Sequence, residues 1–416
     1  MNEQKHTRTF GSLALRPAAA ITILASVMLL VWACSRTSNK PNMPELPATA
    51  VTAPLDSLFT SIFDGNGPGA IIMVARGDSL VYRRAFGYAD IESGSRISDS
   101  TVFNLSSASK VLSSVALLRL AEQGKINLDD SLSKYFPEFP ERFFSHITIR
   151  HILTHSTGLP DLLPRNNDEW NKYLVDHKSI FGFGNDYRLY GSDKEYMQVF
   201  ENLDSVDFEP GRHYQRNDPG YILLAPLIER VTGESFDKWM ADNIFSPAGI
   251  HDIFYRNAGE RTPAMAHGYR QCRPDSKLKS FRSSDGKWEE FDYGEAEFFL
   301  TKADRGAYSS ARDYMNWVIA LHNGKLINDS SLTALNTPYL ATDAKDVYFG
   351  LGNGVEQKAG YPLKAYHKGI NGGFSIIEGI WPESRLSYLV FSNRNDWNSD
   401  SVAETVDSIF KAKGWL

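Results

Sequence analysis

The stretch NLSSASKVLSSVALLRLAEQGK, residues 104–125, places a serine and a lysine three residues apart at the head of a long apolar run. Apolar residues recur at the helical period over residues 111–121, and Gly124 ends the pattern, so the run predicts a buried helix. A spacing of three puts Lys110 one turn beyond Ser107 on the same face of that helix. The pattern therefore indicates a candidate serine nucleophile with an amine beside it.

The motif Ser-x-x-Lys also occurs elsewhere in the chain, so its surroundings must distinguish the copies. The other serines that begin it are Ser131, Ser235, Ser276, Ser284 and Ser408. Ser107 alone stands at the start of a long helix that could be buried. A helix N-terminus favours an anionic oxygen, and its dipole together with burial favours an uncharged Lys110 that could accept the serine proton. The alternative interpretation is a buried helix with a serine-rich N-cap.

The composition is typical of a globular protein and excludes a nucleic-acid binder. The chain has 416 residues, 42% hydrophobic and 23% charged, with a formal net charge of −6. A length of this order allows one large domain or two interwoven domains. The acidic balance lacks the basic footprint of nucleic-acid-binding proteins, so we expect no nucleic-acid partner.

The N-terminus predicts an export signal rather than part of the fold. Basic residues precede a short apolar run that ends at Cys34, which is the pattern of a secretory signal peptide. Residues 30–34, LVWAC, resemble a bacterial lipobox, which implies cleavage before Cys34 and attachment of lipid to it. We therefore expect a lipoprotein signal peptide at 1–33, a flexible tether at 34–54 and one folded domain at 55–416. An uncleaved N-terminal membrane anchor is the alternative.

The residues near Cys34 also bear on location. Ser35 follows the lipid-bearing cysteine, which by the sorting rule of enterobacterial lipoproteins favours the outer membrane, with the body facing the periplasm. Cys272 is the only other cysteine, so lipidation of Cys34 would leave no intrachain disulfide. The body must then be held together by its hydrophobic core, for which its length suffices.

Strand-forming runs gather at the two ends of the chain. Runs at 70–75 and 79–88 flank a turn signal and predict an antiparallel hairpin, and two more runs occupy 372–382 and 385–393. Helical patterns occupy 55–63, 111–123, 149–154, 221–232, 236–244, 311–323 and 401–413. We expect an α+β fold in which an antiparallel sheet from both chain ends is flanked by helices, beside a mostly helical middle region. The polar stretch 269–291 predicts an exposed excursion.

The region around Ser107 resembles the serine β-lactamase-related family, which includes class C β-lactamases, DD-peptidases and related esterases. The resemblance rests on FNLSSASKVLSSVALLRLAEQGKINLDDSLSKYFPEF and continues, in the family's order, through ITIRHILTHSTGLPD, RGAYSSARDYMNW and HKGINGGFSIIEGIWPES. It implies a β-lactamase/transpeptidase-like fold over nearly the whole body. It also implies that Ser107 is the acyl-accepting nucleophile and Lys110 its partner base.

The family's third motif is a lysine or histidine followed by a hydroxyl residue and a glycine. His367-Lys368-Gly369 resembles its histidine version, with Lys368 in place of the hydroxyl residue. By family position the N–H groups of Ile370 and Ser107 would form the oxyanion hole, and His367 would orient the substrate. Gly369 would let the strand pass close to a ligand. A glycine-rich turn with a surface histidine is the alternative.

The family's second motif, Tyr-x-Asn, is where this chain departs from the pattern. In PGRHYQRNDPGY, counting back without gaps from residues 220–221 places Arg216 in the tyrosine slot and Asp218 in the asparagine slot. A locally shifted loop would use Tyr214 and Asn217 instead. A phenol beside the lysine could activate the serine, whereas an arginine stays charged and cannot act as a base. We therefore favour Tyr214 as the third catalytic residue.

Two further signals favour structural roles. His151 and His155 lie four residues apart, a spacing that can hold zinc, but no adjacent glutamate accompanies them and the segment reads as a helix end. We therefore expect no metal site. The aromatic residues within 288–299 are expected to pack in the core or in a loop rather than to form a ligand platform.

Together these features predict an exported, lipid-anchored serine hydrolase that forms an acyl-enzyme at Ser107. Its substrate, a small molecule or peptide, would be an ester or an amide, including D-amino-acid or cell-wall-related amides. His367 and Lys368 favour an esterase or peptidase over a dedicated β-lactamase. The alternatives are a class C-type β-lactamase and a catalytically weak, penicillin-binding-like module that holds a ligand. The resemblance implies no metal or organic cofactor.

Overall fold

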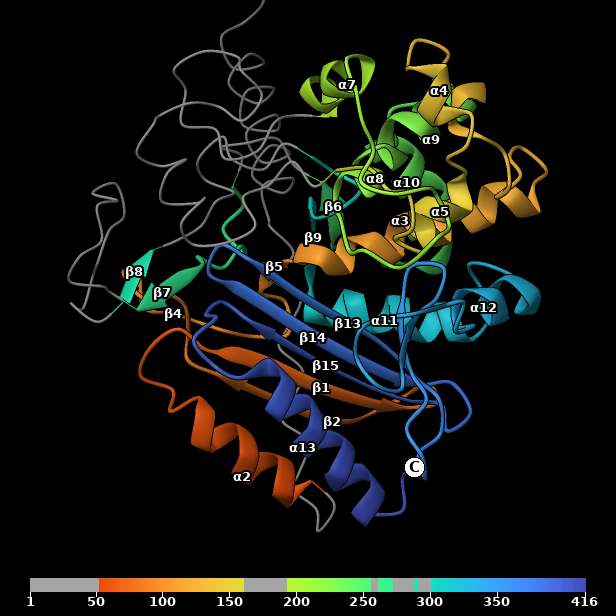
Figure 1. Cartoon of the computed structure of the whole chain (residues 1–416). Coiled ribbons are helices and arrows are strands. Elements are labelled where there is room, and N and C mark those ends of the chain that lie inside the picture. Colours follow the sequence, from red (N-terminus) through yellow and green to blue (C-terminus); the bar gives the residue numbers. More distant parts are fainter. Residues whose placement is uncertain (1–51, 161–192, 256–260, 272–287, 291–300) are drawn as a thin grey trace, which may run out of the picture. The chain divides into compact units, whose positions relative to one another are not determined.

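Residues from the two ends of the chain form one antiparallel sheet. The computed structural model describes residues 52–160, 193–255, 261–271, 288–290 and 301–416. The main sheet has eight strands in the order β10-β11-β12-β13-β14-β15-β1-β2, so the last strand lies beside the first (Figure 1). The strands are β1 (Ala70–Arg76), β2 (Ser79–Phe86), β10 (Leu340–Ala341), β11 (Val347–Phe349), β12 (Gly354–Glu356), β13 (Lys364–Asn371), β14 (Phe374–Trp381) and β15 (Leu386–Ser392). The predicted α+β fold is confirmed.

Both predicted pairs of terminal strands form. β1 pairs with β2, and β14 pairs with β15, each in antiparallel register. The two pairs join where β1 meets β15, with Ala70 opposite Ser392 and Arg76 opposite Leu386. Every residue of β1 before Arg76 is buried, because both faces of this central strand are covered.

Alternating side chains of β1 divide the sheet between two hydrophobic layers. Ile72 and Val74 pack in a cluster with residues of α2 (Ala53–Ile62) and α13 (Ser399–Ala412), which cover the outer face (Figure 1). Ile71 and Met73 belong to a larger cluster on the inner face, which contains residues of the two long helices α3 (Ser109–Glu122) and α11 (Ala311–His322). The inner layer is therefore the one that carries the predicted nucleophile helix.

In its described residues the middle of the chain is mostly helical, as expected, but these helices are short. Its elements are η2 (Leu132–Lys134), α4 (Glu141–Phe144), α5 (Ile149–Leu153), α7 (Asp193–Glu201), α8 (Pro219–Ile222), α9 (Leu224–Thr232), α10 (Phe236–Met240), η3 (Ala241–Phe245) and η4 (Ser246–Ala248), with α12 (Asp329–Leu335) later in the chain. The predicted helix 221–232 divides at Leu223 into α8 and α9. Within the described segments no helix has both the length and the apolar character that a membrane span needs.

Three small sheets account for the other strands of the described residues. They are β5 (Val102–Asn104) with β9 (Ala307–Ser310) and β6 (Ile253–Tyr255), then β3 (Tyr88–Asp90) with β4 (Ser95–Arg96), and β7 (Tyr269–Gln271) with β8 (Trp288–Glu290). The expected exposed excursion at 269–291 is wrong at its described ends. Tyr269 and Trp288 are buried, and the Arg394 guanidinium lies 4.5 Å from the centre of the Trp288 ring. The two ends pair as strands and therefore belong to the folded body.

Only the first part of strand β13 pairs with its neighbour β12. β12 pairs with residues 364–366 of β13, whereas β14 pairs with residues 365–371. The second half of β13 instead approaches η1 (Ser106–Ala108), the short turn that leads into α3. This edge, residues 367–371, brings the third sequence motif to the predicted nucleophile.

Candidate active site

Ser107 lies in the short 3-10 turn η1 at the head of the buried helix α3. The residue before it, Ser106, has a left-handed backbone with φ of 51°, which non-glycine residues seldom adopt. The Ser106 N–H donates to Asn104 Oδ1 at 2.9 Å and holds this turn. Ser107 is half-buried, whereas Ser106 and Ala108 are fully buried. The turn thus leaves Ser107 accessible at the start of an otherwise buried helix.

Asn104 ties the nucleophile turn to strand β13. Its Oδ1 also accepts a hydrogen bond from Asn371 Nδ2 at 2.8 Å, and its Nδ2 donates to the Arg305 carbonyl oxygen at 3.2 Å. Gly369 permits the close approach, because a Cβ there would lie 2.7 Å from the Ser107 backbone nitrogen. The glycine backbone of β13 therefore lies directly against the nucleophile turn.

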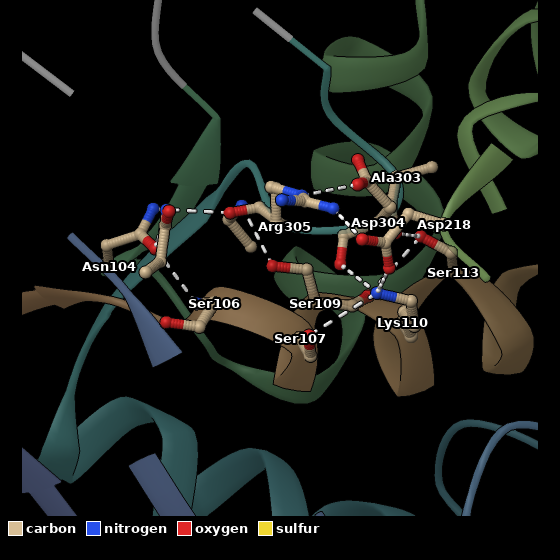
Figure 2. Close-up of polar contacts among 12 residues, drawn as sticks. Asn104, Ser106, Ser107, Ser109, Lys110, Ser113, Asp218, Ala303, Asp304 and Arg305 are labelled. Atoms are coloured by element: carbon tan, nitrogen blue, oxygen red, sulfur yellow. Dashed lines mark hydrogen bonds and ion pairs between the residues drawn. The ribbon is translucent and has the colours of Figure 1, made fainter. Parts of the chain in front are cut away.

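Residues 303–307 run along the first turns of α3 and border the site, as Figure 2 shows. Ser113 Oγ donates to the Ala303 carbonyl oxygen at 2.8 Å. The Ala307 N–H donates to Ser109 Oγ at 3.1 Å. These hydrogen bonds position residues 303–307, including the carbonyl oxygen of Asp304, beside Lys110.

Lys110 is buried and lies between the nucleophile and a carboxylate. Its side chain is 3% exposed, and its Nζ lies 3.4 Å from Ser107 Oγ, 3.1 Å from the Asp304 carbonyl oxygen and 2.8 Å from Asp218 Oδ1 (Figure 2). A carboxylate at this distance stabilises the charged ammonium form of a lysine. The geometry therefore differs from the expectation of an uncharged Lys110, because the sequence did not show that Asp218 would face it.

Arg216, rather than Tyr214, reaches the nucleophile. Arg216 Nη2 donates to Ser107 Oγ at 3.0 Å. The Tyr214 ring instead lies 6.0 Å from the His155 ring and 5.5 Å from the Phe349 ring, measured between centres. Burial raises the pKa of Tyr214, although the Arg216 charge opposes this, and a raised pKa disfavours the phenolate that a base would need. Arg216 therefore stands in the tyrosine slot, as counting without gaps predicted. This position differs from our preference for Tyr214.

Asp218 connects Lys110 to a second pair of charged residues. Its Oδ1 accepts from Lys110, and its Oδ2 pairs with Arg305 Nη2. Arg305 Nε in turn donates to Asp304 Oδ2 at 2.7 Å. The Asp304 residue is fully buried, and burial raises the pKa of its carboxyl while the Lys110 charge opposes that shift. The result is a chain of alternating charges that begins beside the serine at Lys110 and ends at the fully buried Asp304 (Figure 2).

Asn217, the other alternative for the second motif, points into the protein. It is 2% exposed, and its Nδ2 donates to the Leu159 carbonyl oxygen at 2.9 Å. Its backbone N–H donates to His155 Nδ1 at 3.4 Å. Burial, followed by the charges of Lys110 and Arg216, lowers the pKa of His155 well below its ordinary value. Asn217 and His155 thus form an uncharged support behind the loop that carries Arg216.

His367 is buried, so the alternative of a surface histidine is wrong. Its Nε2 lies 2.6 Å from Asn353 Oδ1, and Asn353 Nδ2 donates to Asn336 Oδ1 at 2.6 Å. Because Asn353 Oδ1 is the acceptor in this arrangement, His367 Nε2 carries the proton. Burial, followed by the charges of Lys110 and Arg216, lowers the pKa of His367 to about 3. The imidazole is therefore neutral at physiological pH.

Lys368 points to the outer face of the sheet, away from the nucleophile. It pairs with Asp400 of α13, the helix that covers the outer face. The alternation of a strand places His367 and Gly369 on the inner face and the side chains of Lys368 and Ile370 on the other. The Ile370 side chain is 63% exposed, while its backbone follows directly after the contact of Gly369 with η1.

The remaining sequence signals lie away from this site or outside the described residues. In the other described Ser-x-x-Lys copies the lysines engage other groups, namely Lys134 with Asp130, Lys238 with Glu234 and Asp242, and Lys411 with the Tyr361 ring. His151 Nδ1 accepts from the Thr148 N–H at 3.2 Å in a capping box. The predictions that concern Cys34, Ser276, Ser284 and the aromatic residues of 291–299 lie outside the described part of the chain.

Several residues of the site carry no motif and were not anticipated. They are Asn104, Asp304, Arg305, Asn353 and Asn371. Asn104 precedes the Ser-x-x-Lys motif by three residues, and Asn371 follows the third motif closely, so proximity to a motif was their one signal. Asp304 directly precedes the family-like segment RGAYSS and Arg305 is its first residue, so proximity to that segment was their signal.

Comparisons with known proteins identify the family and the fold. The family model described as Beta-lactamase matches residues 51–408. Penicillin-binding protein 4* of Bacillus subtilis (strain 168) is 24% identical over 347 residues, which cover 82% of this chain and 72% of the relative. Esterase EstB of Burkholderia gladioli is 29% identical over 242 residues, or 57% of this chain and 60% of the relative. The solved D-amino acid amidase of Ochrobactrum anthropi SV3 has a TM-score of 0.67 at 20% identity, covering 88% of this chain and 99% of that one.

The fold and the match define a class of protein, the serine hydrolases with a β-lactamase/transpeptidase-like fold. The chain belongs to the beta-lactamase family.

Replacing Gly369 by alanine tests the contact between β13 and the nucleophile turn. The new Cβ would lie 2.7 Å from both the Ser107 nitrogen and the Ser106 Cβ, so the strand must move away. We expect kcat/KM for an ester substrate to fall by about 100-fold, the order seen when an oxyanion donor is displaced. Circular dichroism should show a retained fold. Gly360→Ala, in the turn before β13, is the control, and equal activity of G369A and G360A would contradict the role of this contact.

Replacing His367 by glutamine tests the neutral histidine. The folded-state pKa of about 3 lies below the ordinary value of 6.5, so between these values only the unfolded chain binds the proton. The free energy of unfolding therefore falls as pH drops below about 6.5, by about 2 kcal/mol from this residue between pH 7 and pH 5. Urea unfolding should show that the free energy of unfolding falls less between pH 7 and pH 5 in H367Q than in the wild type, and the difference should equal that amount. Equal losses in the two proteins would contradict the assignment.

Proposed function

We propose that this protein is an exported, lipid-anchored serine hydrolase that forms an acyl-enzyme at Ser107 and acts on ester or amide substrates. The observation that carries the proposal is the position of Ser107 Oγ, which receives hydrogen bonds from Lys110 and Arg216 beside the edge of β13. Two cationic donors on one hydroxyl oxygen stabilise negative charge as it develops there. Such an arrangement suits a nucleophile and has no evident structural purpose.

The proposed reaction has two stages. Ser107 Oγ attacks the substrate carbonyl, and the leaving group departs to give an acyl-enzyme, which water then hydrolyses. The N–H groups of Ser107 and Ile370 would hold the oxyanion, because Gly369 brings the β13 backbone next to the Ser107 nitrogen. His367 is neutral and is held by Asn353, so it would present an uncharged polar side chain to the substrate. No step in this scheme requires a metal or an organic cofactor.

The charge of the site favours substrates that carry an anionic group near the scissile bond. Arg216 is exposed, and within the described part of the chain no carboxylate is paired with its guanidinium. Burial, followed by the charges of Lys110 and Arg216, lowers the pKa values of His155 and His367, so the positive charge at the nucleophile comes from Lys110 and Arg216. Peptides that end in a free D-amino acid, and related cell-wall amides, have this charge pattern. Two similar proteins are an esterase and a D-amino acid amidase, which supports ester and D-amino-acid amide substrates.

A second candidate is a catalytically weak module that holds a ligand in the manner of a penicillin-binding protein. The observation that favours it is Arg216, which stands where the family has a tyrosine and cannot act as a base. A class C-type β-lactamase is a third candidate, and it is the least favoured because Lys368 points away from the site.

Ser107→Ala should abolish hydrolysis of a short-chain nitrophenyl ester and labelling by a fluorophosphonate probe. Ser131→Ala, which changes another Ser-x-x-Lys serine, is the matched control and should label as the wild type does. Wild-type turnover of the nitrophenyl ester, a D-Ala-D-Ala peptide and a chromogenic cephalosporin then separates the candidates. We expect turnover of the first two. Undiminished labelling of S107A would rule out this nucleophile, and rapid turnover of cephalosporin alone would favour the β-lactamase.

The proposed lipid anchor is tested at Cys34. Cells that express the full chain with a labelled fatty acid should produce a labelled protein in the outer-membrane fraction, because the lipobox-like residues 30–34 direct lipid to this thiol. Cys34→Ala should lose the label, while Cys272→Ala should keep it. Label that persists in C34A would contradict the anchor without affecting the proposed chemistry.

A further inference from the structure

Asp218 is the neighbour of Lys110 that can take up a proton. An ammonium group has three N–H donors and no lone pair, so Lys110 cannot accept the serine proton unless it first releases one of its own. Its Nζ lies within hydrogen-bond distance of Ser107 Oγ, the Asp304 carbonyl oxygen and Asp218 Oδ1. Of these three oxygens, a hydroxyl that is losing a proton and a peptide carbonyl are poor acceptors, whereas the carboxylate oxygen is a good one.

We infer that Asp218 accepts the proton that Lys110 releases as Lys110 deprotonates Ser107, so that a lysine–aspartate couple replaces the lysine–tyrosine couple of the family. This inference rests on the proposed function, since it concerns the acylation step at Ser107. It gives a role to the residue in the asparagine slot, which carries no proton-transfer function in the family pattern.

The other titratable groups near Ser107 are unsuited to this role. Arg216 stays protonated, and Tyr214 packs against the rings of His155 and Phe349 rather than against the lysine. His155 Nδ1 already accepts the Asn217 N–H, and the protonated Nε2 of His367 faces Asn353. Among the described residues, the charged and titratable groups that face Asp218 and its partners include Lys110, Arg305, Asp304, Arg216, His155 and His367, with the Tyr221 ring 5.6 Å from Lys110 Nζ and with Asp193 near Asp304.

Arg305 is the residue that positions Asp218. It pairs with Oδ2 of Asp218 and thereby leaves Oδ1 directed at Lys110. Its own orientation is held by Asp304, which accepts its Nε at 2.7 Å and lies fully buried. The two cations stabilise the ionised form of the carboxylate, which is the form that can accept a proton.

The acylation step balances in atoms and charge. As the bond from Ser107 Oγ to the carbonyl carbon forms, the hydroxyl proton passes to Lys110 Nζ and a different Nζ proton passes to Asp218 Oδ1. The carbonyl π pair moves to the carbonyl oxygen. When this pair returns, the bond to the leaving group breaks, and the leaving group takes a proton from Lys110, which recovers its own from Asp218. Lys110 is an ammonium before and after, and no co-reactant is needed.

Asp218→Asn is a sharp test because it restores the asparagine of the family motif. If this slot only needs an amide, D218N should retain or gain activity. A proton acceptor instead predicts that kcat/KM for the nitrophenyl ester falls by about 100-fold or more. Asp218→Glu, which keeps a carboxylate, should retain more activity than D218N. Glu209→Gln removes a carboxylate whose side chain is 82% exposed from the same loop, and should behave as the wild type.

The double variant Arg216→Tyr with Asp218→Asn should exchange one proton acceptor for the other. It installs the family's Tyr-x-Asn pattern at the positions that face Ser107 and Lys110. We expect it to recover activity relative to D218N. The pH profile should also change, from level across neutral pH in the wild type to rising with pH in the double variant, because a phenol of ordinary pKa near about 10 must ionise.

The outcomes separate this inference from the proposed function. Slow but complete fluorophosphonate labelling of D218N, in a protein whose thermal unfolding resembles that of the wild type, would support the inference. Wild-type kcat/KM and pH profile in D218N would overturn it. A loss in D218N that neither D218E nor the double variant relieves would also overturn it, since Asp218 would then be only structural. Failure of the wild type itself to label would contradict the proposed function instead.

Discussion

The active site depends on one close approach between the sheet and the nucleophile turn. At Gly369 the backbone of β13 lies where any larger residue would strike the Ser107 nitrogen, and Asn104 joins the two segments through a side-chain oxygen shared by Ser106 and Asn371. This contact holds the left-handed backbone of Ser106, which sterics alone disfavour. The accessibility of Ser107 therefore follows from a contact between segments that are distant in sequence.

Local patterns predicted the elements of the fold because they depend on neighbouring residues. The alternation and turn signals of the terminal strands, and the helical period after Lys110, each predicted an element that the structure contains. The family resemblance predicted an antiparallel sheet from both chain ends, but the order of its eight strands was not predicted, because it depends on how the elements pair over the whole chain. The prediction of an exposed excursion at 269–291 was wrong at its described ends, because it followed the polar composition of the stretch and gave no weight to Tyr269 and Trp288, which are buried.

The second motif shows where the sequence could not decide. Residues 208–218 have no regular secondary structure, so no hydrophobic period determines which of Tyr214 and Arg216 faces the serine. The choice depends on long-range contacts, namely Arg216 with Ser107 and Asp218 with Lys110. Once both contacts are in place, the charge state expected for the lysine changes as well. A shift of two residues in a loop thus alters the chemistry that the site can perform.

The sheet order has a consequence for the timing of synthesis. The nucleophile helix emerges early from the ribosome, but β13, β14 and β15 are made last, and β1 must wait for β15 as a neighbour. Pairings between such distant segments form late because a long loop must close first. A nascent or truncated chain that lacks its final strands therefore has Ser107 without a facing glycine edge. The nucleophile turn therefore acquires its facing edge only after β13, β14 and β15 have been synthesised and β15 has paired with β1.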